Sequence, residues 1–428
     1  MKSSIAFVLD GRIVEVSFNP SSQLTPTTTV LNYLRNLPHH RGVKEGCAEG
    51  DCGACTVVLG ELAADDRIGY KAVDSCLVFL PMLHGKQLIT VENLKSSSGE
   101  LHPVKQALVS AHGSQCGFCT PGIVMTLFAL FKAKNRPSRD EIADALSGNL
   151  CRCTGYRPII DAAADVCRGD GKDHFTDGEA HVVNLLRSIS NESVSISTEQ
   201  QRYDEPATLK ECLSLRERHP DAIVINGATD VALRATKNFE ILAHIIDCSR
   251  ISELREVSRD AHTLTIGAGV RMSELRGVVQ KDFPAFYEML TVFGAQQIRN
   301  LASLGGNIGT ASPVGDILPV LIAYGAHIVL SSNRGTRSVP ADTFVTGYRT
   351  TECRPDELIT AIVLPLPSGR TMVRTYKVSK RRDLDIATVS AAFRLDLDNK
   401  GVVNDITLAY GGMADRIKRS VATEAFLK

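Results

Sequence analysis

Eight of the twelve cysteines in this 428-residue chain fall into two groups with the spacing of metal ligands. The first group follows the pattern Cys-x4-Cys-x2-Cys-x20-Cys, and the second follows Cys-x2-Cys-x31-Cys-x-Cys. Three close thiolates with a distant fourth are the plant-type ligand spacing of a [2Fe–2S] cluster. The sequence therefore predicts two iron–sulfur clusters, and with them a protein that carries electrons. The predicted metal ligands are Cys47, Cys52, Cys55 and Cys76 for the first cluster and Cys116, Cys119, Cys151 and Cys153 for the second.

Two tetrathiolate zinc sites are the alternative interpretation of these cysteines. Zinc ribbons favour two Cys-x2-Cys pairs that are separated by a moderate loop. The first group does not have this pattern, and the second ends in Cys151-Arg152-Cys153, which is too tight for a zinc knuckle. We therefore favour iron–sulfur clusters over zinc for both groups.

The composition is ordinary for a globular protein, with 43% hydrophobic and 22% charged residues. Lys plus Arg and Asp plus Glu both number 48, so the balance of charge indicates neither a nucleic acid nor a membrane as partner. The first ten residues contain too short an apolar run for a signal peptide, and no run approaches the roughly 18 residues of a membrane-spanning helix. We expect a cytoplasmic protein whose thiols stay reduced and available to metals. The cysteines outside the two groups are expected to be buried small hydrophobic residues: Cys167, Cys212, Cys248 and Cys353.

Two glycine-rich segments could hold phosphate groups. Residues 225–230 follow a predicted strand, and residues 303–313 form the second segment. Glycine lets backbone N–H groups approach phosphate oxygens closely. Neither segment has the Gly-x-Gly-x-x-Gly pattern of a Rossmann site, and ordinary turns are the alternative. Beside two iron–sulfur clusters a flavin becomes the favoured ligand, because it can take one or two electrons at a time. The basic stretch at residues 377–383 could bind an anionic cofactor, although a solvated surface is the simpler interpretation.

Short strands and one helix are predicted around the first cysteine group. Residues 5–9 and 13–18 flank the turn dipeptide Asp10-Gly11, which predicts a β-hairpin. A helix is predicted over residues 29–37 and a strand over residues 56–59. The glycines of the cysteine loop are expected to let the backbone curl and point N–H groups at the cluster sulfurs.

The second cysteine group lies in a region with helical spacing of apolar residues. Pro121 fits the first turn of a helix, and Ser138 with Glu141 forms a capping box. Short loops between the helices predict a small bundle. The cysteine pairs fall at helix termini, where free N–H groups favour an anionic cluster. The predicted helices cover residues 104–111, 121–134, 138–146 and 157–167.

The rest of the chain begins with a polar segment and continues as alternating helices and strands. Residues 168–203 are predicted to be a linker, with a short helix at 180–189. After them the pattern indicates α+β or α/β structure without internal repeats. A helix is predicted at residues 208–218, and strands at 222–226, 245–247, 263–267, 327–330, 358–364, 389–395 and 403–410.

Four segments together resemble the xanthine dehydrogenase family of molybdenum hydroxylases. KEGCAEGDCGACT at residues 44–56 resembles the family's first cluster loop, QCGFCTPG at 115–122 and NLCRCTGY at 149–156 resemble the second, and residues 298–319 resemble its FAD loop. The resemblance covers nearly the whole chain and implies an α+β multidomain fold. Its implied parts are a β-grasp ferredoxin-like domain (1–85), a four-helix bundle [2Fe–2S] domain (86–167), the linker (168–203), a two-part α/β FAD-binding domain (204–366) and a C-terminal α+β flavoprotein domain (367–428). The family's last domain usually continues beyond such a C-terminal helix, so we expect this one to be shortened.

The resemblance also implies which residues bind FAD. One segment would cradle the pyrophosphate and ribityl chain, and a second would form another phosphate turn. Phe293 and Ile359 would pack on cofactor rings, with an ordinary core position as the alternative, Asp316 would accept a hydrogen bond from a hydroxyl, and Lys377 would place a cation near the ring system. Relatives often have Gly-Gly-Thr or Gly-Asn-Thr where this chain has Gly-Ala-Thr. The first segment is Val224, Ile225, Asn226, Gly227, Ala228, Thr229, Asp230 and Val231, and the second is Ser303, Leu304, Gly305, Gly306 and Asn307.

The family pattern further implies a partner and a direction of electron flow. Electrons would pass from a molybdopterin centre through the helical-domain cluster and the ferredoxin-like cluster to FAD and then NAD+. Gln115 would reach a pterin amino group of the partner, with a local helix-end amide as the alternative. No molybdopterin-binding segment is evident, so we assign no catalytic proton-transfer residue to this chain.

We therefore expect the small electron-transfer subunit of a heteromeric xanthine dehydrogenase that oxidises hypoxanthine and xanthine to urate. Its expected partner is a large molybdopterin-binding subunit, in a dimer of heterodimers. The alternatives are the same role in an aldehyde or N-heterocycle hydroxylase and a stand-alone iron–sulfur flavin reductase.

Overall fold

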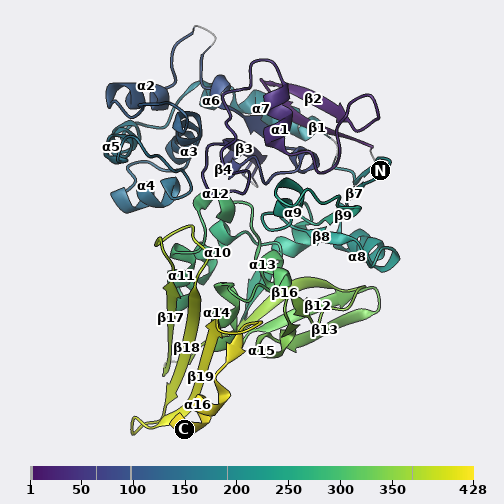
Figure 1. The fold of residues 1–428 in the computed structure, drawn as a ribbon, viewed down its shortest axis with the longest axis vertical. Helices are drawn as coiled ribbons and strands as arrows, with labels where there is room; N and C mark the ends of the chain where they lie inside the picture. The colour runs from purple at the N-terminus through teal and green to yellow at the C-terminus, as the bar shows by residue number, and fades with distance from the viewer. Residues whose placement is uncertain (1–2, 64, 97–98, 190, 369) are drawn as a thin grey trace. The chain divides into compact units, whose positions relative to one another are not determined.

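The computed structural model describes residues 3–63, 65–96, 99–189, 191–368 and 370–428. The chain divides into two compact units, each built from segments that are far apart in the sequence (Figure 1). Unit 1 comprises Met1–Glu205, Ala228–Ile245 and Ala295–Leu301, and unit 2 comprises Pro206–Gly227, Ile246–Gly294 and Ala302–Lys428.

The N-terminal part of unit 1 is a five-stranded mixed sheet with one helix. Its strand order is β2-β1-β5-β3-β4, and only the β1–β5 pair is parallel. The predicted hairpin is confirmed, with both turn residues, Asp10 and Gly11, in the left-handed region at φ 52° and 71°. The predicted helix is also confirmed, and Thr29 caps it by accepting a hydrogen bond from the Asn32 backbone. The elements are β1 (Ser4–Leu9), β2 (Arg12–Ser17), α1 (Val30–Asn36), β3 (Thr56–Leu62), β4 (Ile68–Asp74) and β5 (Gln87–Ile89), with short 3-10 turns at Leu80–Leu83 and Val91–Asn93.

Four helices follow, and one of them is almost entirely buried. They are α2 (Pro103–Ser110), α3 (Thr120–Ala133), α4 (Arg139–Leu146) and α5 (Arg157–Val166). Every residue of α3 from Gly122 to Phe131 is buried, because α2, α4 and α5 pack around it and β3 and β4 lie against it. The capping box of Ser138 and Glu141 is present at the start of α4. The predicted bundle is therefore confirmed.

The polar segment after the bundle contains regular structure that packs on the first sheet. It forms α6 (His174–Asp177), α7 (Glu179–Ser188), β6 (Val194–Ser197) and β7 (Arg202–Glu205). Val183 and Leu186 of α7 are buried against Ala6, Val8 and Ile68 of the sheet. The short helix expected near residues 180–189 is thus α7. Unit 1 also contains α9 (Ala232–Thr236), α12 (Gln296–Arg299) and the first residues of β9 (His244–Asp247).

Unit 2 contains two antiparallel sheets. The first has the strand order β10-β11-β16-β12-β13, and α13 packs against β16. The second has the order β17-β18-β19-β20, and α14 packs on β18 and β19. The expected α+β multidomain fold is confirmed. The elements of the first part are α8 (Leu209–Arg218), β8 (Ile223–Ile225), η3 (Ser252–Arg255), β10 (Val257–Arg259), β11 (Thr263–Gly267), α10 (Met272–Val279), α11 (Pro284–Thr291), α13 (Leu304–Thr310), α14 (Ile317–Ala323), β12 (His327–Ser332), β13 (Gly335–Pro340), α15 (Ala341–Phe344), β14 (Val345–Gly347), β15 (Thr350–Thr351) and β16 (Leu358–Pro365).

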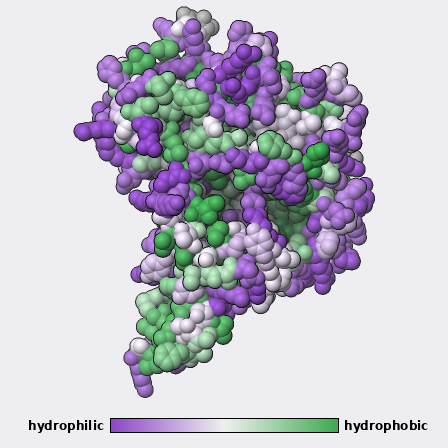
Figure 2. All heavy atoms as spheres, in the orientation of Figure 1, coloured by the Kyte–Doolittle hydropathy of each residue, from purple (hydrophilic) through white to green (hydrophobic). Residues whose placement is uncertain are grey.

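The C-terminal part of unit 2 consists of β17 (Thr371–Val378), β18 (Val389–Leu397), β19 (Val403–Gly411), β20 (Lys418–Arg419) and α16 (Val421–Leu427). Apolar side chains gather on its surface at the lower end of the view in Figure 2. Val421, Phe426 and Leu427 of α16 are among the exposed ones. Within the described residues, no helix has both the length and the apolar character needed to cross a membrane.

Candidate functional site

The first cysteine loop joins α1 to β3 and is curled by residues in the left-handed region. Ala48, Gly50 and Gly53 all have positive φ, at 55°, 76° and 67°. Gly53 has a second reason to be glycine, since any side chain there would collide with the carbonyl oxygen of Gly148. The curl points backbone N–H groups at a sulfur, as the glycine content of the loop predicts. The donors are Glu49 and Asp51, whose nitrogens lie 3.4 and 3.3 Å from Cys47 Sγ.

The four thiols of the first group meet in two pairs. Cys47 is hydrogen-bonded to Cys52, and Cys55 to Cys76. The bond from Cys52 lowers the pKa of the Cys47 thiol to about 5, and the thiolate is the form that binds metal. Among the described residues no three Cys, His, Asp or Glu side chains lie close enough to hold a single metal ion. Two pairs of thiols fit a two-iron cluster, in which each iron takes two protein ligands.

A buried carboxyl group lies beside this cluster site, and no sequence pattern had indicated it. Asp74 is fully buried at the end of β4, with Oδ1 3.9 Å from Cys55 Sγ and 3.3 Å from Thr56 Oγ1. Burial raises the pKa of Asp74 to about 8. Only its place two residues before Cys76 could have drawn attention to it in the sequence.

The second group also forms two pairs, but it reaches the surface. Cys116 is hydrogen-bonded to Cys153, and Cys119 to Cys151. Cys116 and Cys153 are exposed, whereas Cys119 and Cys151 are half-buried. Cys119 occupies the N-cap position of α3, as predicted for a helix terminus. For Cys151 and Cys153 the same prediction is wrong, because both lie in the loop between the end of α4 at Leu146 and the start of α5 at Arg157. The four thiols again fit a two-iron cluster.

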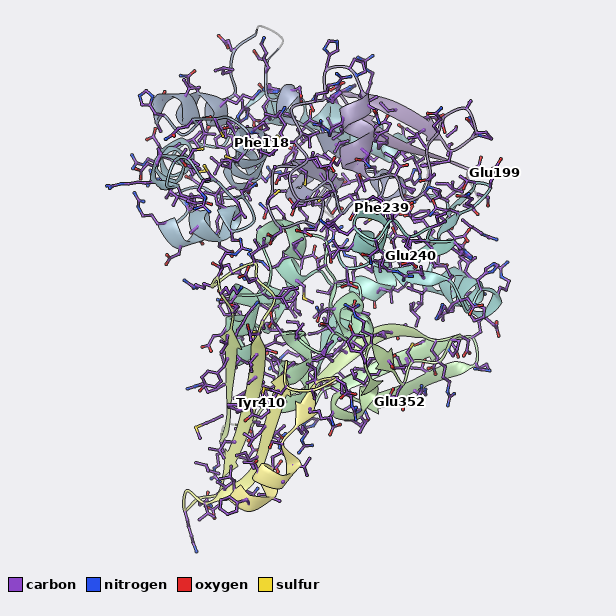
Figure 3. The ribbon with its side chains drawn as sticks, viewed as in Figure 1. Phe118, Glu199, Phe239, Glu240, Glu352 and Tyr410 are labelled. Atoms are coloured by element: carbon purple, nitrogen blue, oxygen red, sulfur yellow. The ribbon has the colours of Figure 1, made fainter. Side chains whose placement is uncertain are left out.

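Exposed apolar and amide side chains flank the cysteines of the second group in the sequence. Phe118, labelled in Figure 3, is 49% exposed, and Leu150 is 37% exposed. Gln115, the predicted pterin contact, is exposed next to Cys116.

The two cysteine loops touch each other through the backbone. The Leu150 amide donates to the Cys52 carbonyl at 3.0 Å. Cys52 belongs to the first group, and Leu150 precedes Cys151 of the second. The predicted ligands of the two clusters are therefore joined by one hydrogen bond and a short stretch of chain.

In unit 2 the structure brings the two glycine-rich segments together. Ser303 caps α13, because its Oγ accepts from the Gly306 amide at 3.2 Å. The same hydroxyl donates to the Asn226 carbonyl at 3.2 Å. Ile359 of β16 lies against Gly309 of α13. The second predicted phosphate turn therefore lies beside Asn226, in the part of the first glycine-rich segment that belongs to unit 2.

Asp316 and Lys377 form a buried ion pair that the sequence did not indicate. Their side chains are 7% and 4% exposed, and Lys377 Nζ lies 2.7 Å from Asp316 Oδ2. Lys377 also donates to the Val292 carbonyl at 2.9 Å. Val292 directly precedes Phe293 in the sequence. Asp316 Oδ1 is buried without a hydrogen-bond partner among the described residues. An unsatisfied buried acceptor fits a site that takes up a hydroxyl of FAD.

For the other predicted flavin contacts the structure gives the unit in which they lie and their burial. Val224 to Gly227 lie in unit 2, whereas Ala228 to Val231 lie in unit 1. Ala228 has φ 59°, a left-handed conformation that glycine and asparagine adopt more readily than alanine. Phe293 and Ile359 are half-buried. In the basic stretch, Lys380, Arg381 and Arg382 are exposed, as expected for a solvated surface.

The four isolated cysteines are mostly core residues, as expected. Cys167, Cys212 and Cys248 are buried, and Cys353 is half-buried. Cys212 and Cys248 are not isolated in space, since their sulfurs lie 3.3 Å apart.

Four domain families match successive parts of the chain. They are the 2Fe-2S iron-sulfur cluster binding domain (residues 18–80), the [2Fe-2S] binding domain (90–164), the FAD binding domain in molybdopterin dehydrogenase (197–367) and the CO dehydrogenase flavoprotein C-terminal domain (374–428). Xanthine dehydrogenase of Drosophila pseudoobscura pseudoobscura is 35% identical over 96% of this chain and 34% of its own length. That of Emericella nidulans is 33% identical over 99% of this chain and 35% of its own length. The chain belongs to the xanthine dehydrogenase family of molybdenum hydroxylases.

A protein with a solved structure shares the fold of part of the chain. A carbon monoxide dehydrogenase of Hydrogenophaga pseudoflava that lacks the Mo-pyranopterin moiety is 28% identical, with a TM-score of 0.51 over 54% of this chain and 81% of that one. The chain spans about a third of the length of the xanthine dehydrogenases it matches. Its domains support iron–sulfur and FAD cofactors and an electron-transfer role in an oxidoreductase of this family. The individual ligands stay predictions.

Proposed function

We propose that this chain is the electron-transfer subunit of a xanthine dehydrogenase. A separate molybdopterin subunit would oxidise hypoxanthine and xanthine to urate, and this chain would pass the electrons through two [2Fe–2S] clusters and FAD to NAD+. The observation that carries the proposal is the contact between the two cysteine loops, each of which has its thiols in pairs. The names of the relatives support xanthine as the substrate.

The exposure of the cysteines suggests a different role for each cluster. The exposed Cys116 and Cys153 would hold the cluster that meets the partner, beside Gln115 and Phe118. The buried Cys55 and Cys76 would hold the inner cluster away from water. Bound FAD would supply the change between one- and two-electron transfer.

The flavin site would be held by the ion pair of unit 2. Asp316 Oδ1 would accept a hydrogen bond from a cofactor hydroxyl, and Lys377 would keep the Asp316 carboxylate charged and in place. Since Lys377 is paired, its charge near the flavin is largely balanced by Asp316. The remaining flavin contacts predicted from the sequence are part of this proposal.

We further propose a dimer of heterodimers in the cytoplasm. Thiol ligands need a reducing compartment, which supports the cytoplasm. The exposed amide of Gln115 beside an exposed cluster ligand favours a pterin-bearing partner over a stand-alone reductase.

A second candidate is the same role in another molybdenum hydroxylase. The match of residues 374–428 to the CO dehydrogenase flavoprotein C-terminal domain favours keeping it, because that domain occurs beyond xanthine enzymes. Aldehydes and N-heterocycles are then the substrate classes to compare with xanthine.

The test is an anaerobic titration of the complex that co-purifies with this chain from its native host. Adding xanthine should bleach the flavin and iron–sulfur absorption, and NAD+ should restore it. Bleaching by an aldehyde or an N-heterocycle but not by xanthine would reject xanthine and favour the second candidate. Purification without any larger chain, with full absorption that no substrate bleaches, would contradict the partner.

A further inference from the structure

A buried asparagine connects the two cysteine loops. Asn149 is 2% exposed and lies two residues before Cys151. Its Oδ1 accepts from Thr126 Oγ1 at 2.7 Å and from Gln297 Nε2 at 2.8 Å. Its Nδ2 donates to the Gly53 carbonyl at 3.0 Å and to Thr56 Oγ1 at 3.1 Å. An amide side chain has two donor hydrogens and two acceptor lone pairs, so this one is fully satisfied.

The partners of Asn149 come from three different parts of the chain. Gly53 lies between Cys52 and Cys55, and Thr56 follows Cys55 directly, so both belong to the first cluster loop. Thr126 belongs to α3, the helix that Cys119 caps. Gln297 belongs to α12, which lies within the residues matched by the FAD-binding domain. One side chain thus joins both cluster sites and a segment of the flavin domain.

The backbone at this point is packed too closely for other side chains. A side chain at Gly122 of α3 would collide with the Gly53 carbonyl oxygen, the same atom that accepts from Asn149. Thr56 and Gln297 are as buried as Asn149, at 2% and 0% exposure. Gln297 Nε2 also donates to Thr126 Oγ1 at 2.9 Å, which closes a triangle of buried polar groups. Asn149 makes all four of its possible hydrogen bonds within this network, and together they hold its amide in a single arrangement. Gln297 Oε1 is buried without a hydrogen-bond partner among the described residues.

We propose that Asn149 is a positioning residue that sets the distance and orientation between the two iron–sulfur clusters, with Gln297 locking its amide in place. The inference rests on the proposed function, because it requires both clusters. The four hydrogen bonds of Asn149 go to groups other than the predicted ligand sulfurs, so it would act through the Gly53 backbone on one side and the chain leading to Cys151 on the other. The adjacent hydrogen bond from Leu150 to Cys52 depends on the same close approach.

The decisive variant is Asn149→Leu, which has similar volume and no hydrogen-bonding group. In the dithionite-reduced holoprotein, paramagnetic resonance should still show two distinct cluster signals. The magnetic interaction between them, measured as line splitting and as mutual relaxation enhancement, should weaken, because it falls steeply with distance. Redox titration should show shifted midpoint potentials. A folded variant that keeps both the interaction and the potentials of the unaltered protein would overturn the proposal.

Matched variants keep the test decisive if Asn149→Leu does not fold. Thr126→Val removes one donor to Asn149 and should weaken the interaction, whereas Thr126→Ser keeps the hydroxyl and should restore it. Equal spectra for Thr126→Val and Thr126→Ser would overturn the proposal. Ser147→Ala is the control, since the Ser147 hydroxyl donates within its own turn, to the Asp144 carbonyl, and not to Asn149 or its partners among the described residues. An unaltered protein without two cluster signals would instead reject the proposed function itself.

Discussion

Asp316 and Lys377 form a buried ion pair in which the charge of each residue is stabilised by the other. Desolvation raises the pKa of Asp316, and Lys377 opposes that rise. Removing one member of a buried pair leaves the other charge without compensation. At the residue scale, the flavin site that we propose here would therefore depend on both side chains together.

Replacing Lys377 by methionine should destabilise the protein by about 3–5 kcal/mol, the usual effect of breaking a buried pair. The measurement is the free energy of unfolding in urea. Lys380→Met is the control, because Lys380 is exposed three residues along the chain and should change stability by less than about 0.5 kcal/mol. Equal effects of the two substitutions would contradict the importance of the ion pair.

Replacing Ala228 by glycine should stabilise the protein. The Ala228 φ of 59° is unfavourable for a residue with a Cβ, so Ala228→Gly should stabilise the protein by about 1 kcal/mol. Ala232 lies in α9, where the same change should destabilise by about 1 kcal/mol or more. Urea denaturation of the two variants should give opposite signs, and the same sign for both would contradict the explanation.

Substituting one cysteine from each group should remove one cluster signal at a time. Cys47→Ser should abolish the signal of the first cluster and Cys116→Ser that of the second, because one iron of the cluster concerned loses a thiolate ligand. Paramagnetic resonance of the reduced protein makes the comparison, with Cys353→Ser as a control that keeps both signals. If both cysteine variants retain both signals, the ligand assignment is wrong.

At the scale of elements, the polar segment after the bundle is held by buried charges as well as by apolar packing. Asp173, the N-cap of α6, lies 2.9 Å from His102 Nε2 and 2.8 Å from Lys132 Nζ. Burial alone would raise the pKa of Asp173, but the hydrogen bonds from His102 and Lys132 outweigh it and hold the pKa well below its usual range. The segment is therefore polar in composition and yet fixed to the bundle by buried ion pairs.

The depressed pKa of Asp173 gives stability that is present above the unfolded-state pKa of about 3.9 and is lost as the pH falls below it. Asp173→Asn should therefore lower stability by about 3 kcal/mol at neutral pH. The difference from the unaltered protein should shrink as the pH falls below about 4. Urea unfolding at pH 7 and pH 3 measures both values, and a difference that is independent of pH would contradict this account. Asp170→Asn is the control, since Asp170 is exposed in the same segment.

At the scale of the whole molecule, an exposed surface around the second cluster is where we expect the partner. Aromatic residues at the centre of an interface often contribute about 2 kcal/mol or more to binding. Phe118→Lys should therefore weaken co-purification of the larger subunit while both cluster signals remain. Phe239→Lys is the matched control, because Phe239 is 85% exposed and also lies in unit 1 (Figure 3). Equal loss of the partner in both variants would contradict the surface we assign.

Much of the fold could be predicted from the sequence, because the signals were local. The hairpin at Asp10-Gly11, the capping box at Ser138 and the bundle helices each depend on residues a few positions apart. The helices between β11 and β12, α10 to α14, were not predicted individually. Each has only four to eight residues, which is too short for a clear helical period in the sequence. The polar segment was misleading for the opposite reason, because its buried charges look like solvated ones.

The sequence by itself determined the two cysteine groups, the order of the domains and the family. The spacing of such ligands can be recognised from the positions of the cysteines in the sequence, without knowledge of the packing. Only the tertiary structure decided that Asp74 lies beside Cys55, that Asn149 joins both loops to Gln297, and that Asp316 is paired with Lys377. The last two contacts link residues 148 and 61 positions apart, and such pairs form only when separate elements pack and exclude water.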